Sequence, residues 1–253
     1  MSTWCAAQYL KFAEERTRPS RDLASRIDVS RPMSIIDLGC GPGNSTEVLA
    51  QRWPDAQVTG LDNSTKMIEA ARSAHPEYRW VEADIAGWSA NGAGERFDIV
   101  FSNAALQWLP DHAFLLPALL QRVGPGGAFA FQMPAHGSPA HRLMQTLARS
   151  RSLQVADWHC HEPAFYYDVL SLSAARVDLW ETEYVHVMDD AEGIVEWYRG
   201  TGLRPYLGAL PTESERERFL AEFLDGVRKT YPKQIDGKVL FPFRRLFAIA
   251  YTA

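Results

Sequence analysis

The stretch that decides the fold is Met33-Ser-Ile-Ile-Asp-Leu-Gly-Cys-Gly-Pro-Gly-Asn-Ser-Thr46. Its first half is a short apolar run rich in β-branched residues, which predicts a buried strand of a parallel sheet. Glycine then occupies alternate positions at Gly39, Gly41 and Gly43. This spacing permits a sharp turn and lets a ligand lie directly against the backbone. A strand followed by a glycine-rich turn and a helix predicts a nucleotide site at the edge of an open α/β sheet.

The residues around the turn bear on which nucleotide binds. A dinucleotide fingerprint requires glycine at the first, third and sixth positions of the turn, but the sixth position counted from Gly39 is Asn44. Asp37, just before the turn, would repel a phosphate and suits a cationic group, such as the amino group or sulfonium region of S-adenosylmethionine. We expect the following helix to begin with Asn44 or Ser45 as its N-cap.

Polar residues also end or follow the next three predicted strands, which we expect at residues 57–62, 78–83 and 97–102. These polar residues are Asp62, Asp84 and Asn103. Asp62 lies close to the roughly 20-residue separation at which an acidic residue binds ribose hydroxyls in such folds. A helix cap for the segment after it is the alternative role for Asp62.

Length and composition fit one large α/β domain with a full core, because the chain has 253 residues and 46% of them are hydrophobic. The longest apolar runs fall short of the roughly 18 residues that a membrane-spanning helix needs, and no secretory signal pattern is visible. Cys5, Cys40 and Cys160 fit no disulfide or zinc spacing. We therefore expect a cytoplasmic protein that does not bind membranes.

The charge pattern argues against nucleic-acid binding, since the net charge is −5 and no block of Lys and Arg occurs. The segment Trp158-His-Cys-His-Glu162 contains metal-ligand residue types. Adjacent residues cannot all face one ion, so we expect no metal site. The oligomeric state cannot be inferred from the sequence.

The order of elements is repeated strand and helix to about residue 152, which predicts a parallel sheet with right-handed crossovers. A tight turn is expected at 124–127, before a fifth strand at 128–133. Later elements are long strands and helices, expected at 176–188, 191–199, 213–229 and 241–251. We predict one domain over 1–253, with N-terminal helices in 1–31 over the cofactor cleft. Lid and substrate-pocket insertions are expected at about 152–175 and 189–238.

The motif Asp37-Leu-Gly-Cys-Gly-Pro-Gly43 resembles the first motif of class I S-adenosylmethionine-dependent methyltransferases. The resemblance implies a Rossmann-like α/β fold with a seven-stranded, mostly parallel sheet, an antiparallel edge strand and a helical lid insertion. It also implies that Asp62 binds the ribose, that Asp84 meets the adenine amino group and that Ile85 lies on the ring.

Three longer stretches, at 9–19, 103–111 and 194–207, are similar to the family of trans-aconitate 2-methyltransferases. The resemblance implies methylation of one carboxylate of a small tricarboxylate, with S-adenosyl-L-methionine as methyl donor and S-adenosyl-L-homocysteine as product. The predicted cofactor-binding residues are Asp37, Gly39, Cys40, Gly41, Gly43, Asn44, Asp62, Asn63, Met67, Asp84, Ile85, Asn103, Ala104 and Trp108.

The chemistry of the acceptor decides which other groups are needed. Methyl transfer from a sulfonium is a direct displacement, so the enzyme must align the reactants and exclude water. An anionic acceptor needs no general base, and we find none. It needs cations and hydrogen bonds instead, although the common role of a single arginine is a solvated surface charge. The predicted substrate-binding residues are Arg204, Arg199, Tyr206, Arg16, Arg18 and Trp108.

Arg204 is the most specific of these predictions. It follows two glycines, Gly200 and Gly202, that permit unusual backbone angles, and it precedes Pro205, which restricts its backbone. We expect such a loop to direct Arg204 toward the acceptor. Two alternatives remain open. One is a methyltransferase for another small-molecule or acyl-carrier-bound carboxylate, and the other is a non-catalytic regulator that binds S-adenosylmethionine.

Overall fold

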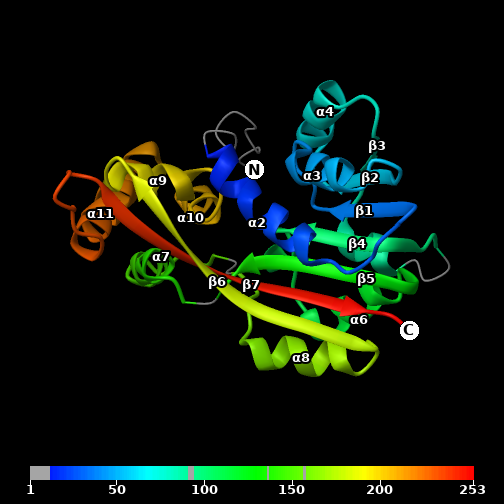
Figure 1. Cartoon of the computed structure of the whole chain (residues 1–253). Coiled ribbons are helices and arrows are strands. Elements are labelled where there is room, and N and C mark those ends of the chain that lie inside the picture. The colour runs from blue at the N-terminus through cyan, green and yellow to red at the C-terminus, as the bar shows by residue number, and fades with distance from the viewer. Residues whose placement is uncertain (1–11, 91–93, 136, 156–157) are drawn as a thin grey trace. The chain divides into compact units, whose positions relative to one another are not determined.

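We describe a computed structural model of the chain over residues 12–90, 94–135, 137–155 and 158–253 (Figure 1). The chain divides into two compact units, which are described separately. The sheet unit comprises Ala13–Ala135, Trp158–Thr182 and Arg245–Ala253. The helical unit comprises Phe12, the described part of 136–157, and Glu183–Arg244. The segments predicted as insertions are thus divided, because residues 158–175 belong to the sheet unit.

Seven strands of the described residues form one sheet in the order β3-β2-β1-β4-β5-β7-β6. Their bounds are β1 Ser34–Leu38, β2 Gln57–Asp62, β3 Arg79–Glu82, β4 Phe97–Asn103, β5 Val123–Pro134, β6 Arg176–Met188 and β7 Val239–Tyr251. Strands β1 to β5 pair in parallel, whereas β7 is antiparallel to β5. The predicted fold class, a mostly parallel seven-stranded sheet with antiparallel pairing toward one edge, is confirmed.

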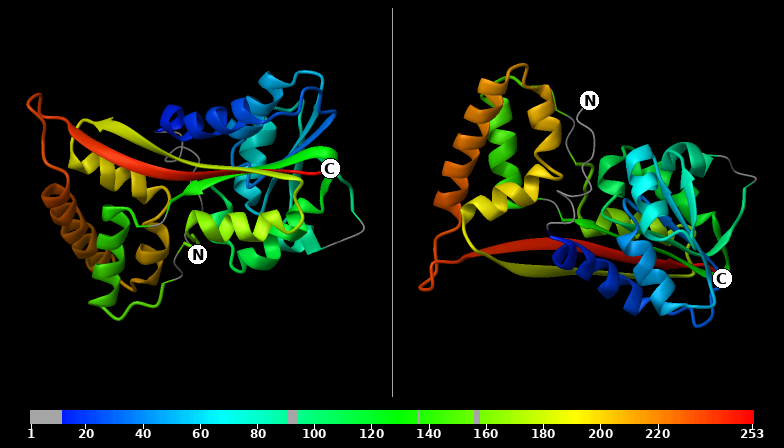
Figure 2. Two further views of the ribbon diagram at one scale, coloured as in Figure 1. Left: turned by 60° about the horizontal axis from the view of Figure 1, so that its bottom comes forward. Right: turned by 90° about the horizontal axis from the view of Figure 1, so that it is seen from above.

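Helices cover both faces of the sheet in the sheet unit. Helices α2 (Ala13–Arg26) and α3 (Asn44–Arg52) pack together on one face (Figure 2). On the other face, α6 (His112–Leu120) contacts both α5 (Ile85–Ala90) and α8 (Pro163–Ser171). Helix α4 (Thr65–Ala74) packs on β2 and β3. This two-sided cover explains why the strands read as nearly continuous apolar runs.

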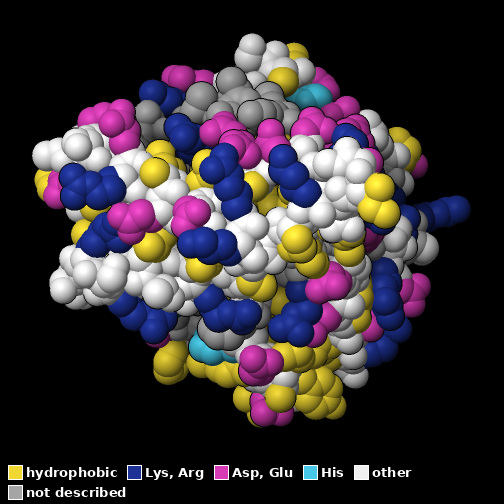
Figure 3. Space-filling model, turned by 90° about the vertical axis from the view of Figure 1, so that its left-hand side faces the viewer, with side chains coloured by type: hydrophobic (Ala, Val, Ile, Leu, Met, Phe, Trp, Pro, Cys, Tyr) yellow, Lys and Arg dark blue, Asp and Glu magenta, His cyan; other side chains and the backbone are white. Residues whose placement is uncertain are grey.

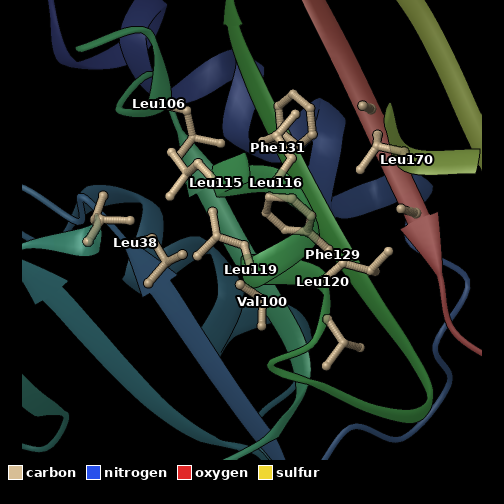
Figure 4. Close-up of a cluster of buried hydrophobic side chains, with 14 of the residues drawn as sticks. Leu38, Val100, Leu106, Leu115, Leu116, Leu119, Leu120, Phe129, Phe131 and Leu170 are labelled. Atoms are coloured by element: carbon tan, nitrogen blue, oxygen red, sulfur yellow. The ribbon is translucent and has the colours of Figure 1, made fainter. Parts of the chain in front are cut away.

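The core between α6 and the sheet is built mainly from leucine and phenylalanine. The buried leucines of α6 recur at helical spacing and are Leu115, Leu116, Leu119 and Leu120. They lie in one cluster with Phe129 and Phe131 of β5 (Figure 4). Burying one such side chain stabilises the fold by about 1.5–3 kcal/mol, so this face of the sheet provides a rigid base for the loops at the strand ends.

The helical unit has a core of its own. Helix α11 (Glu213–Thr230) packs on α7 (Pro139–Arg149) and on α9 (Ala191–Arg199), with the short helix α10 (Arg204–Ala209) before it. Thr212 and Glu215 form a capping box at the start of α11, which stabilises its first turn. None of the helices in the described residues is long and apolar enough to cross a membrane.

The tight turn predicted at 124–127 is wrong. These residues lie inside β5, where the pairing with β4 shifts register between Phe97 and Ile99. Gly126 has a positive φ of 69°, and the backbone N–H of Gly127 donates to Thr252 Oγ1 at 3.0 Å. The glycines therefore accommodate an irregularity within the strand, which local turn chemistry alone does not distinguish from a chain reversal.

Candidate functional site

The order of the strands reverses between β1 and β4, because β2 and β3 lie on one side of them and β5, β7 and β6 on the other. In open α/β sheets, ligands bind outside the carboxyl ends of the strands at such a switch point. The loops after β1 and β4 meet here, since a Cβ added at Gly39 would lie 2.2 Å from the Cβ of Ala105. The predicted glycine turn and the segment after β4 are therefore neighbours.

The three glycines of the turn have positive φ angles of 73°, 55° and 100°, at Gly39, Gly41 and Gly43. A Cβ on Gly39 would overlap Ala105, and a Cβ on Gly43 would lie 2.9 Å from the Trp80 ring. A Cβ on Gly41, in contrast, would meet nothing within 4 Å. Two of the glycines thus permit close packing within the protein, and Gly41 borders open space that a ligand can use.

The prediction that Asn44 or Ser45 caps the helix after the turn is wrong. The N-cap of α3 is Gly43, and Asn44 is the first helical residue. The hydroxyls of Ser45 and Thr46 instead donate to Asp37 Oδ2 at 2.6 and 2.7 Å. A hydrogen bond to a carboxylate is stronger than a hydrogen bond between neutral groups, so these side chains point back to the end of β1 instead of capping the helix.

Asp37 is fully buried and lies on the face of the sheet where α3 begins. Its second oxygen, Oδ1, is buried and has no hydrogen-bond partner among the residues described. Burial raises the pKa of Asp37 to about 6, the Ser45 and Thr46 hydroxyls oppose the rise, and the charge of Asp62 adds to it. A positive group placed beside Oδ1 would satisfy this oxygen and favour the ionised carboxylate.

Asp62, the last residue of β2, holds two neighbouring loops. Its Oδ2 accepts a hydrogen bond from the Gly41 N–H at 2.9 Å, and its Oδ1 accepts one from the Ser64 N–H at 2.9 Å. Burial raises the pKa of Asp62. Each oxygen retains a lone pair beyond the one used here. The bond to Ser64 matches part of the alternative cap role, and the ribose role stays a prediction.

The other predicted cofactor residues lie nearby in the sheet unit. Asp84 is exposed and its Oδ2 accepts a hydrogen bond from the Gly87 N–H at 2.8 Å, which starts α5. Ile85 is buried, and its Cδ1 lies 3.8 Å from the Cβ position at Gly39, so it borders the turn. Cys40 and Met67 are buried as well, whereas Asn63 is exposed.

The segment after β4 has an unusual backbone. Ala104 has a positive φ of 56°, and both its polar groups are held. Its N–H donates to the Gln132 carbonyl at 2.9 Å, and its carbonyl accepts from Gln107 Nε2 at 2.7 Å. Trp108 follows, half-buried, with its ring edge-on to that of Trp158 at 6.0 Å. Strain of this kind clusters at functional sites because surrounding contacts impose it.

Gln132 contributes to this edge but was not among the predicted site residues. Its side chain donates to Asn103 Oδ1 and accepts from Arg245 Nη1. The signal in the sequence was a single polar residue inside the apolar stretch Ala128–Met133. A polar side chain in a buried strand requires hydrogen-bond partners, and here the partners lie on two other strands, β4 and β7.

The residues predicted to bind the substrate are divided between the two units. In the sheet unit, Arg16 of α2 is buried and Arg18 is exposed. In the helical unit, Tyr206 is buried and its ring stacks on that of Phe219 at 6.0 Å. Arg199 is exposed and pairs with Glu196 at 3.0 Å. These residues are not placed relative to one another.

Arg204 is half-buried at the first position of α10, and burial lowers its pKa. Gly200 does not use the conformational freedom that glycine permits, since its φ is −73° and it ends α9. The segment before Arg204 is therefore a turn between two helices. The start of α10, with Pro205 in its first turn, fixes the backbone of Arg204 in place of the expected glycine geometry.

Comparison with known proteins agrees with this geometry. A methyltransferase domain family matches residues 35–127. The trans-aconitate 2-methyltransferase of Azoarcus sp. (strain BH72) is 48% identical over 255 residues, which cover 99% of each chain. The enzyme of the same name from Rhodopseudomonas palustris (strain HaA2) is 44% identical over 258 residues, again 99% of each chain.

Solved structures share the fold at lower identity. The YcgJ protein of Bacillus subtilis has a TM-score of 0.61 at 16% identity and covers 93% of this chain and 98% of its own. Haemonchus contortus phosphoethanolamine N-methyltransferase 2, solved with S-adenosylhomocysteine, has a TM-score of 0.57 at 15% identity. This similarity covers 93% of this chain and 53% of that chain. At such identities the likeness concerns the fold alone.

Proposed function

The chain belongs to the trans-aconitate 2-methyltransferase family, and we propose that it transfers a methyl group from S-adenosyl-L-methionine to one carboxylate of trans-aconitate. The product is a monomethyl ester. The observation that carries the proposal is the pair of carboxylates at the glycine turn. Asp62 Oδ2 accepts from the Gly41 N–H, beside open space, and the buried Asp37 Oδ1 lacks a hydrogen-bond partner among the described residues. Two acids beside a glycine turn suit a cationic nucleoside and repel the phosphates of a dinucleotide. A cytoplasmic location is part of the proposal.

The residues present fit this cofactor. The buried Asp37 Oδ1, which lacks a hydrogen-bond partner among the described residues, would accept from the cationic amino group. The remaining lone pairs of Asp62 would accept the two ribose hydroxyls in charge-assisted hydrogen bonds. Gly41 leaves room for the ligand against the backbone, and Asp84 and Ile85 would meet the adenine amino group and ring.

No group of the protein needs to form a covalent bond in this reaction. When bound, S-adenosylmethionine supplies a methyl group on a sulfonium, and a carboxylate lone pair forms the new O–C bond while the C–S electron pair leaves with sulfur. No proton is transferred, so no general base is required. The side chains of the site align the acceptor and keep water away. Trp108, packed on Trp158, is suited to the second task.

The cations that would bind a tricarboxylate are arginines. Arg16 is buried in α2, which packs on β5, and Arg204 is half-buried at the start of α10. A desolvated guanidinium gains more from a carboxylate than an exposed one, since water screens the charge less. We propose these two as the main acceptor-binding residues. Arg18, Arg199, Tyr206 and Trp108 complete the proposed set.

An acidic acyl-carrier protein as substrate would require a basic docking surface. On the face drawn in Figure 3, Lys and Arg side chains are interspersed with Asp and Glu. The net charge of −5 likewise does not favour an acidic macromolecule. A small tricarboxylate therefore fits better than a carrier-bound carboxylate.

The test is a product assay with purified protein, S-adenosylmethionine and trans-aconitate, read by mass spectrometry. We expect a monomethyl ester, formed faster than from cis-aconitate, citrate or simple dicarboxylates. Faster methylation of another carboxylate would identify that compound as the substrate in place of trans-aconitate. Tight cofactor binding without any methylated product across this panel would instead identify a non-catalytic binding protein.

A further inference from the structure

A buried chain of hydrogen bonds crosses three strands behind the candidate site. Arg245 Nη1 donates to Gln132 Oε1 at 3.0 Å, and Gln132 Nε2 donates to Asn103 Oδ1. The three residues lie on β7, β5 and β4, and strand pairing sets Gln132 directly beside Asn103. Their exposed fractions are 4%, 0% and 9%, in the order Arg245, Gln132, Asn103. All three are buried, and Asn103 retains the largest exposed fraction.

The direction of this chain is fixed at its buried end. A guanidinium has donors and no acceptor, so Gln132 must turn its oxygen toward Arg245. The amide nitrogen of Gln132 then faces Asn103, which must answer with its own oxygen. Asn103 is left with its Nδ2 donors directed away from Gln132. Because Arg stays protonated at any pH at which proteins fold, this polarity does not change with pH.

Asn103 carries the chain to the edge where the cofactor is proposed to bind. It is the last residue of β4, and β1 pairs with β4 so that Asp37 faces Phe101. Two residues further along, Asn103 is level with Gly39 and on the same face of the sheet as Asp37. Asn103 Nδ2 makes no hydrogen bond within the described part of the chain.

We infer that Arg245, Gln132 and Asn103 form a polarity relay that presents an N–H donor to a ligand carboxylate at the carboxyl end of β4. The inference rests on the proposed function, in which two ligands carry carboxylates. These ligands are the methyl acceptor and S-adenosylmethionine, through its methionine part. An N–H donor held in one orientation favours a ligand carboxylate over a ligand group that is cationic or is itself a hydrogen-bond donor. Asn103 touches the ligand, and Gln132 and Arg245 are positioning residues.

Two substitutions of Asn103 should rank in opposite order when ligand affinity and thermal stability are measured. Asn103→Asp keeps the acceptor for Gln132 but turns the outward donor into a negative acceptor. Asn103→Ala removes both groups without adding charge. The relay predicts that affinity for the carboxylate ligand falls in the order Asn, Ala, Asp. It predicts that the melting temperature falls in the order Asn, Asp, Ala, because only Ala leaves the buried Gln132 Nε2 without an acceptor.

The experiment measures the affinity for S-adenosylmethionine, and for trans-aconitate in the presence of S-adenosylhomocysteine, by titration calorimetry. A pH of about 8 keeps the introduced carboxylate ionised. We expect Asn103→Asp to weaken one ligand at least about tenfold, which corresponds to about 1.4 kcal/mol. A loss for trans-aconitate alone assigns the donor to the acceptor, and a loss for S-adenosylmethionine alone assigns it to the methionine carboxylate.

Gln132→Glu tests the relay without touching the ligand. A glutamate would pair with Arg245 and leave no donor for Asn103 Oδ1, so the Asn103 amide would lose its fixed orientation. We expect the same ligand to weaken as with Asn103→Asp, by a smaller factor. Gln57→Glu is the matched control, because Gln57 is exposed at the opposite end of β2 and should leave both affinities unchanged.

An Asn103→Asp variant that binds both ligands as well as Asn103→Ala, or better, would overturn the relay, because a purely structural asparagine prefers the isosteric replacement. If the wild-type protein does not bind trans-aconitate, the proposed function fails. The relay is then decided by the order of the S-adenosylmethionine affinities alone.

Discussion

The carboxylate of Asp62 accepts a hydrogen bond from the backbone N–H of Gly41 at 2.9 Å. The residue that ends β2 thereby fixes the middle of the turn that follows β1. The other oxygen of Asp62 accepts from the Ser64 N–H, so one side chain holds the loops after two adjacent strands. In the proposed function the same carboxylate binds the ribose, which couples the shape of the turn to cofactor recognition.

Asp62→Ala should weaken S-adenosylmethionine binding by tenfold or more, since hydrogen bonds to a charged group contribute about 1.5–3 kcal/mol. The affinity of Asp62→Asn should lie between those of wild type and Asp62→Ala, because its one acceptor oxygen can accept from the N–H of Gly41 or of Ser64 but not from both. Titration calorimetry measures both variants. Unchanged affinity in Asp62→Ala would remove this residue from the ribose site.

The glycines of the turn should separate stability from binding. Gly41→Ala should fold, with a cost of about 1–2 kcal/mol for a left-handed alanine, and should bind S-adenosylmethionine at least about tenfold more weakly because the new methyl group occupies ligand space. Gly39→Ala should lower the melting temperature more, since its Cβ would overlap Ala105. Thermal unfolding and calorimetry on the two variants test this contrast, and equal cofactor affinity in Gly41→Ala and wild type would contradict it.

The raised pKa of Asp37 should appear in the pH dependence of stability. Burial raises this pKa from 3.8 to about 6, so the folded protein holds the proton more tightly than the unfolded chain. The stabilisation is complete below pH 3.8 and is lost as the pH rises through about 6. As the pH rises from 3.8 to about 6, the melting temperature of the ligand-free wild type should therefore decrease relative to that of Asp37→Asn.

Saturating S-adenosylmethionine should remove this difference between wild type and Asp37→Asn, because a bound cation favours the ionised carboxylate. A fall in wild-type stability that persists unchanged with the ligand would mean that Asp37 does not face the cationic group.

The absence of a general base predicts a flat pH profile. With a carboxylate acceptor, kcat for the methyl transfer should stay constant from about pH 7 to 9, because the acceptor is already ionised and the step transfers no proton to a protein group. A steep rise governed by one ionisation, not traceable to substrate, would indicate a phenol, amine or thiol acceptor.

The elements predicted from the sequence were those with a clear period. Strand β6 and helix α9 have the predicted bounds, because alternation and helical spacing are local patterns. The glycine turn at 39–43 and the acid at the end of β2 followed from motif chemistry in the same way.

What could not be predicted depends on contacts distant in sequence. The capping role passed to Gly43 because Asp37 competes for Ser45 and Thr46. Gln132 and Arg245 are separated by 113 positions, and only the pairing of β5 with β7 brings them together. A polar residue in an apolar strand signals that a partner exists but does not identify it.

Arg204→Ala is the sharpest test of the acceptor site. Burial lowers the pKa of Arg204, which marks a desolvated cation that would gain from a carboxylate. Losing one partner of such a pair costs on the order of 2–5 kcal/mol, so kcat/KM for trans-aconitate should fall at least about tenfold while S-adenosylmethionine affinity stays unchanged. Arg204→Lys should recover only part of the loss, because a point charge cannot copy a two-point fork. Arg218→Ala is the matched control and should leave kcat/KM unchanged, since Arg218 is exposed on α11 and lies outside the proposed acceptor-binding set. Normal turnover by Arg204→Ala, measured from initial rates over a range of trans-aconitate concentrations, would transfer the role to Arg16 or Arg18.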